Sequence, residues 1–202
     1  PMGAPAFKYE KIFRDNNVKV FSSNFPLYGD MSSRVMNILS SYTPNIEIYS
    51  IDEAFLEFKG FKKHKLESCC KGIQKRVIKW TGIPISIGIA PTKALAKVAN
   101  RISKKFPKKT AGVYCIDSNE KRLKALKWLE IENVWGIGFR HAKRLRGFKI
   151  NSAYDFVSLP DDWVRKQMSV VGLRLKKELE GESILCLEEN RSPKKAIATT
   201  RS

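Results

Sequence analysis

The sequence has no uninterrupted apolar run approaching the eighteen or so residues that a membrane-spanning helix needs. Its first residues, PMGAPAFKYE, lack the charged, apolar and cleavage regions of a signal peptide. The four cysteines (Cys69, Cys70, Cys115 and Cys186) include no CxxC spacing, which argues against a zinc site and against the disulfide framework of a secreted protein. We therefore expect a soluble, cytoplasmic protein with buried thiols and no membrane partner.

Histidine is scarce as well. His64 and His141 have no partner at the spacing of a metal site or a catalytic triad, so we interpret both as surface residues. Most of the tryptophans are expected to anchor the core through their large apolar rings. They are Trp80, Trp128, Trp135 and Trp163.

Acidic residues are much less frequent than basic ones, most of all in the middle of the chain. The chain carries 38 Lys and Arg against 20 Asp and Glu, a net charge of +18. Residues 61–111 hold 14 basic side chains and a single acidic one, whereas residues 1–60 are nearly neutral. A solubilising surface explains a modest surplus of charge, but an excess this large and this local favours a nucleic-acid partner.

With 202 residues and 43% hydrophobic content, the chain can bury a core. Hydrophobic periodicity predicts strands at 18–22, 46–49, 54–58, 85–90 and 112–116, separated by helices over 28–42, 65–83 and 91–106. Ser32 is a possible cap of the first helix. After Asp117 the sequence consists of short helical segments, which indicates a separate small helical domain.

The stretch YSIDEAFLEF (49–58) places two adjacent carboxylates, Asp52 and Glu53, between apolar β-formers. Neighbours in a straight strand point to opposite faces, so the two could share a ligand only at a hairpin turn. Paired carboxylates suit Mg²⁺ in two-metal phosphoryl transfer, which usually needs at least three of them. Judged on the Asp-Glu dipeptide alone, the alternative to a metal site is an exposed acidic turn without a ligand.

Three ordered motifs resemble Y-family translesion DNA polymerases, in particular the UmuC branch of that family. They are SIDEAF (50–55), ISIGIAPTKALAKVANRISKK (85–105) and VWGIG (134–138). Two further matches extend the resemblance through nearly the whole chain, SSNFPLYGDMSSRVM (22–36) and LEGESILCLEE (179–189).

The resemblance implies an α+β fold: a partial polymerase palm, with a βαββαβ-like antiparallel sheet, followed by a small all-helical thumb containing a helix-hairpin-helix. It assigns residues 1–24 to a remnant of the fingers, 25–116 to the incomplete palm and 117–187 to the thumb. Residues 188–202 would be the linker to a little-finger domain that the chain does not include.

By the same resemblance, Asp52 would ligate both Mg²⁺ ions and Glu53 the catalytic ion at the primer hydroxyl. Lys104 matches a position that contacts the incoming triphosphate, although a solvated lysine in a basic run is as good a reading of it. Lys93 and Lys97, four residues apart on one helical face, could both approach a phosphate backbone.

The segment VWGIGFRHAKRLRGFKINSAYDF (134–156) fits a helix-hairpin-helix. Gly136 and Gly138 would let backbone N–H groups at a helix N-terminus reach a DNA phosphate closely. Lys143 and Arg144 belong to a basic cluster just beyond, which favours DNA binding over a plain turn between two helices.

The family's first catalytic aspartate and its steric gate against ribonucleotides have no counterpart in this sequence. We therefore expect the chain alone to be inactive and to be part of a polymerase that uses primer-template DNA and deoxynucleoside triphosphates in the DNA-damage (SOS) response. The resemblance implies UmuD′, a recombinase filament and a sliding clamp as further partners.

Two other functions fit parts of the sequence. A noncatalytic DNA-binding module would use the helix-hairpin-helix and keep the palm as a scaffold. Another palm-type nucleotidyl enzyme, such as a cyclase, would share the acidic hairpin but has no need of a DNA clamp, which makes it the weakest of the three hypotheses.

Overall fold

The computed structural model of the chain describes residues 3–61 and 63–188, without the side chains of residues 63 and 64. The side chain of His64 and residues 189–202 of the expected linker are thus not described. In chain order the elements are η1 (Ala6–Tyr9), α1 (Glu10–Asp15), α2 (Phe25–Ser40), β1 (Ile46–Ile48), β2 (Ala54–Leu56), α3 (Lys63–Thr81), β3 (Ile87–Ile89), α4 (Lys93–Lys105), α5 (Pro107–Thr110), β4 (Val113–Cys115), α6 (Asn119–Trp128), η2 (Ile131–Asn133), α7 (Phe139–Gly147), α8 (Ala153–Val157) and α9 (Asp161–Glu180).

The strands form two separate pairs. β1 and β2 are antiparallel, with Glu47 opposite Phe55, and they confirm the predicted hairpin. β3 and β4 run parallel, with Gly88 opposite Tyr114, so the expectation of a wholly antiparallel sheet is wrong for this pair. The reason is that α4 crosses over between them, and a crossover returns the chain in the same direction.

Helix α4 lies directly against β3. A Cβ at Gly88 would come within 2.2 Å of the Ala96 carbonyl oxygen and of the Asn100 nitrogen, so only glycine permits this approach. The apolar face of α4, including Leu95 and Val98, packs into the same core as the helices α6 to α9. A smaller core lies between α2 and α3, built on residues such as Val35 and Val77.

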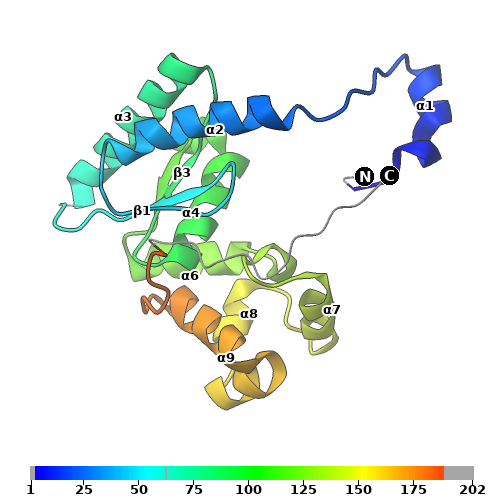
Figure 1. Cartoon of the computed structure of the whole chain (residues 1–202). Coiled ribbons are helices and arrows are strands. Elements are labelled where there is room, and N and C mark those ends of the chain that lie inside the picture. Colours follow the sequence, from blue (N-terminus) through cyan, green and yellow to red (C-terminus); the bar gives the residue numbers. More distant parts are fainter. Residues whose placement is uncertain (1–2, 62, 189–202) are drawn as a thin grey trace.

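Two parts of the chain are easily distinguished in Figure 1. Helices α2 and α3 lie side by side next to the strands, and α6 to α9 gather at the opposite end, beyond α4. The α+β class expected from the sequence is thereby confirmed. Helix α9 is divided by a kink at Ser169, whose backbone is not helical (φ 61°), into two helical segments, which agrees with the short helical segments expected after Asp117.

The N-terminal part differs most from expectation. Residues 18–22 form no strand, and Phe21 is 86% exposed, because no segment in the described part of the chain supplies the backbone partners that a strand requires. Helix α2 begins earlier than predicted, and its cap is Asn24, whose side chain accepts a hydrogen bond from Leu27 N, instead of Ser32. Figure 1 shows α1 standing apart from the rest of the molecule.

Burial corrects two minor predictions. Only Cys70 is a buried thiol, whereas Cys186 is exposed. Trp135 and Trp163 pack against the main core, but Trp80 and Trp128 are exposed and do not anchor it. Of the helices in the described part of the chain, none combines the length and hydropathy that spanning a lipid bilayer requires.

Candidate active site and nucleic-acid interface

The acidic pair lies in the loop of the β1–β2 hairpin, as the sequence predicts. The backbone N–H groups of Tyr49 and Ser50 both donate to the Glu53 carbonyl oxygen at 3.0 Å, which closes the loop. The Ser50 hydroxyl donates to Asp52 Oδ1 at 2.6 Å and orients that carboxylate. Asp52 is exposed, and Glu53 is partly buried.

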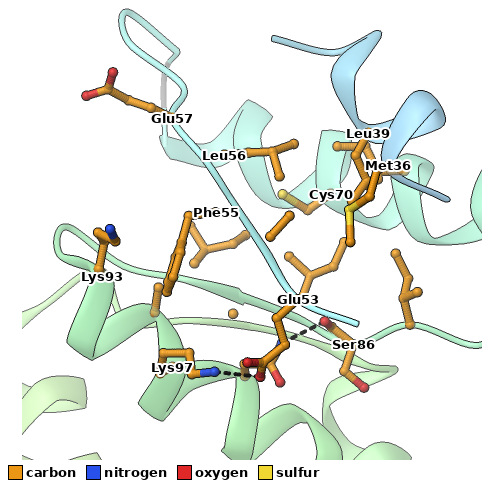
Figure 2. Close-up of a pocket in the computed structure, with 18 of the residues that line it drawn as sticks. Met36, Leu39, Glu53, Phe55, Leu56, Glu57, Cys70, Ser86, Lys93 and Lys97 are labelled. Carbon is orange, nitrogen blue, oxygen red and sulfur yellow. Dashed lines mark hydrogen bonds and ion pairs between the residues drawn. The ribbon is translucent and has the colours of Figure 1, made fainter. Parts of the chain in front are cut away.

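Glu53 forms an ion pair with Lys97 on α4. The distance from Lys97 Nζ to Glu53 Oε1 is 2.5 Å, and the side chains are 21% and 35% exposed. Figure 2 shows the two groups pointing toward each other. The ammonium also lies 5.4 Å from the ring centre of Tyr49 and 6.0 Å from that of Trp135. A cation beside the acidic hairpin was expected, but this pairing was not.

A cavity of about 1350 Å³ opens beside the hairpin. Its apolar wall includes Met36, Leu39, Leu56 and Cys70, which Figure 2 shows on the side away from Lys97. Its polar lining includes Asp52, Glu53, Lys97 and Lys104. The cavity thus brings the predicted metal-binding pair and the predicted triphosphate-binding lysine into one groove.

The donor set suits a hard divalent cation, because carboxylate oxygens are the ligands that Mg²⁺ prefers. Within the described residues, no group of three or more His, Cys, Asp or Glu side chains is placed to hold a metal ion. The hairpin therefore offers two carboxylates, Asp52 and Glu53, which would be the residues that hold Mg²⁺.

Lys93 faces the protein and not the solvent. Its ammonium donates to Glu47 Oε2 at 2.6 Å and to the Cys186 carbonyl at 3.3 Å, and its side chain is only 12% exposed. It also lies 4.9 Å from the ring centre of Phe55. These contacts give Lys93 a structural role, and we do not include it in the proposed DNA surface.

The segment predicted to bind DNA lies at the N-terminus of α7. Gly136 has a φ of +87°, a conformation that glycine adopts without cost, and its place before α7 depends on that. Gly138 caps α7, and a Cβ there would meet no heavy atom of the described chain within 4 Å. Space is therefore left in front of the first N–H groups of this helix.

The basic side chains of α7 are exposed, but several have partners. Arg144 donates to the Gln167 carbonyl and lies 3.2 Å from His141 Nδ1. Arg146 is paired with Glu132, and its guanidinium lowers the pKa of that carboxyl through their hydrogen bond. Lys143 is exposed on the same helix, and His141 is exposed as expected.

Sequence reasoning missed two buried carboxylates, which accept hydrogen bonds from segments far apart in the sequence. Glu178, fully buried near the end of α9, accepts hydrogen bonds from Ala94 N, Ile184 N and Leu185 N at 2.8–3.1 Å. Glu47 accepts from Lys93 and from Glu188 N. The alternation along 46–49 does place Glu47 on one strand face, but nothing local to the sequence indicates its partners.

Comparison with known proteins supplies the family. The model of the impB/mucB/samB family matches residues 1–101, half of the chain. The chain belongs to this family. Among its curated relatives, Protein UmuC of Salmonella typhimurium is 41% identical over 202 residues, which cover 99% of the chain and 48% of that relative. DNA polymerase IV of Saccharolobus solfataricus is 32% identical and covers 79% of the chain.

Solved structures agree with this membership. A DinB family error prone DNA polymerase from Sulfolobus solfataricus superposes with a TM-score of 0.75 at 26% identity, covering 93% of the chain and 55% of that protein. An insertion ternary complex of Dbh DNA polymerase gives a TM-score of 0.73 at 25% identity. The resemblance to Y-family polymerases and to their UmuC branch is therefore confirmed, and this impB/mucB/samB family chain spans about half the length of its curated relatives.

Proposed function

We propose that this chain carries the metal-binding hairpin and a DNA-binding thumb of an error-prone translesion DNA polymerase, which performs template-directed nucleotidyl transfer in the DNA-damage (SOS) response. The observation that supports this most directly is the groove that brings Asp52, Glu53 and Lys104 together. Family membership supports it independently, and so does the start of α7, which has Gly138 at its N-cap and basic side chains along the helix.

Each residue would have a simple task. Asp52 and Glu53 hold Mg²⁺, which when bound favours deprotonation of the primer hydroxyl and neutralises the phosphates. Lys104, exposed on the last turn of α4, binds the incoming triphosphate as a point charge. The N–H groups of α7 behind Gly138, with Lys143 and Arg144 nearby, hold a DNA phosphate without reading sequence.

The 202-residue chain by itself is expected not to extend a primer. By its resemblance to the family, the site needs a third carboxylate from residues that this sequence does not contain. Primer-template DNA and deoxynucleoside triphosphates would be the substrates of the full-length natural protein. UmuD′, a recombinase filament and a sliding clamp are the partners that the family resemblance suggests.

The test is Asp52→Asn in the full-length natural protein. Primer extension should fall by more than about 100-fold, since even residues that only support metal ligands cost 10–100-fold. DNA affinity, measured by fluorescence anisotropy, should be unchanged. Glu67→Gln, which removes an exposed carboxylate paired with Lys71, is the matched control.

A noncatalytic DNA-binding module is the second candidate, favoured by the exposed basic face of α7. In that case Asp52→Asn changes nothing that can be measured, whereas Lys143→Glu with Arg144→Glu weakens DNA binding and flattens its salt dependence. Loss of extension in Asp52→Asn with intact DNA binding excludes this candidate.

A further inference from the structure

Three aromatic rings join the acidic hairpin to the segment that opens the DNA clamp. The Trp135 indole N–H donates to the Tyr49 hydroxyl at 3.2 Å, and the two ring centres are 5.6 Å apart. Phe55 completes the cluster, 5.7 Å from Trp135 and 5.8 Å from Tyr49. We call Tyr49, Phe55 and Trp135 the aromatic bridge. Tyr49 and Phe55 flank the acidic pair, and Trp135 directly precedes Gly136.

Lys97 is held between this bridge and Glu53. Its ammonium pairs with Glu53 and lies over the faces of Tyr49 and Trp135, whose negative π-faces attract a cation. The position of Lys97 therefore depends on that of Trp135, which lies in the segment before α7, 86 residues from Tyr49 in the sequence.

The Lys97 ammonium is paired with the Glu53 carboxylate, and its positive charge would repel a metal ion approaching the same carboxylate. An ammonium and a divalent cation compete for the same carboxylate, because both are positive and the pair is partly shielded from water. The competition ends when another anion pairs with the Lys97 ammonium in place of Glu53. A phosphate of the substrate is such an anion, and a lysine on a flexible stem can follow it without backbone motion.

We propose that Lys97 is a positioning residue that guards Glu53. It holds the carboxylate while no substrate is present and releases it to the metal when a substrate phosphate binds the ammonium, and the aromatic bridge keeps Lys97 within reach of both. The proposal rests on the proposed function and deepens it, since it makes metal binding at the hairpin depend on substrate.

The test measures Mn²⁺ affinity of the full-length natural protein by electron paramagnetic resonance, without substrate and with a dideoxy-terminated primer-template and the next nucleotide. Lys97→Met should bind Mn²⁺ roughly three- to tenfold more tightly without substrate, because the competitor is gone. It should also lose the part of the substrate-induced gain in Mn²⁺ affinity that comes from freeing Glu53, so that substrate raises its Mn²⁺ affinity by a smaller factor than in the unaltered protein. Lys105→Met, on the same helix and exposed outside the groove, removes equal charge and should change neither value.

Trp135 is tested by a pair of variants. Trp135→Leu removes the ring face and the N–H group and should reproduce the tighter, less substrate-dependent Mn²⁺ binding of Lys97→Met. Trp135→Phe keeps a ring face and should restore at least part of the substrate dependence. Circular dichroism checks that each variant folds. If Trp135→Leu does not fold, the Mn²⁺ binding of Trp135→Phe alone tests the role of the ring.

Unchanged or weaker Mn²⁺ binding in Lys97→Met without substrate overturns the guard role. That failure is distinguishable from failure of the proposed function, because Asp52→Asn should abolish Mn²⁺ binding at the hairpin and primer extension whether or not Lys97 competes. If Asp52→Asn alters neither, the proposed function itself is wrong.

Discussion

Lys93 and Glu47 form a nearly buried ion pair that joins the start of α4 to β1. The Nζ to Oε2 distance is 2.6 Å, and the side chains are 12% and 7% exposed. The same Glu47 oxygen accepts from Glu188 N at 2.8 Å, and Lys93 also reaches the Cys186 carbonyl. This ion pair, which has no net charge, therefore holds the segment after α9 against the hairpin.

The stability losses caused by removing Glu47 and Lys93 should not be additive. Glu47→Gln or Lys93→Met leaves one charge poorly solvated, and each is expected to lower the free energy of unfolding by about 2–4 kcal/mol. The double variant should lose less than the sum of the two. Urea denaturation followed by circular dichroism measures all three, and additive losses would show that the two groups act independently.

Glu178 should be the carboxylate of α9 whose replacement destabilises the fold most. Glu178→Gln replaces an oxygen acceptor by a donor where Ala94 N, Ile184 N and Leu185 N all donate, so it should cost about 1–3 kcal/mol and loosen residues 184–188. Limited proteolysis should then cut near residue 185 sooner than in the unaltered chain. Glu182→Gln is the exposed control, and equal cutting of both variants would contradict the anchoring role.

Replacing Gly136 and replacing Gly138 should have different effects. Gly136→Ala forces a Cβ into a left-handed conformation (φ +87°) and should destabilise the fold by about 1 kcal/mol. Gly138→Ala has an ordinary φ of −77° and open space, so its melting temperature should stay unchanged while DNA affinity falls. Thermal melts and fluorescence anisotropy separate the two effects. Unchanged DNA affinity in Gly138→Ala would remove the role of this helix end in phosphate binding.

Thiol chemistry should distinguish Cys70 from Cys186. Burial, reinforced by neighbouring thiols, raises the pKa of Cys70 from 9.0 to about 12, whereas Cys186 is exposed. At pH 8, iodoacetamide should label Cys186 within the time in which Cys70 stays unmodified, as peptide mass spectrometry can show.

The raised pKa of Cys70 also fixes the direction of a pH effect. Because the folded chain holds the neutral thiol, the stabilisation is complete below about pH 9 and is lost as the pH rises toward 12. Cys70→Ala should reduce this alkaline loss. An equally steep loss in that variant would assign it to other groups.

Local pattern predicted most of the elements because their burial is periodic. The acidic hairpin, α3, β3, α4 and the helices α6 to α9 all follow from apolar spacing and from Gly and Pro positions. The same reasoning failed at residues 18–22, where β-formers occur without a neighbouring strand, and for the parallel pairing of β3 with β4. Both outcomes depend on neighbours that the local sequence does not specify.

The sequence by itself determined the family, the position of Asp52 and Glu53 on a hairpin, and a cationic helix after it. Only the tertiary structure decided that Lys93 pairs with Glu47 while Lys97 pairs with Glu53, and that Trp135 donates a hydrogen bond to Tyr49. The lysines look equivalent along the helix because they share one face at a spacing of four. Their partners lie 44 to 46 residues away, so the packing of α4 across the hairpin separates their roles.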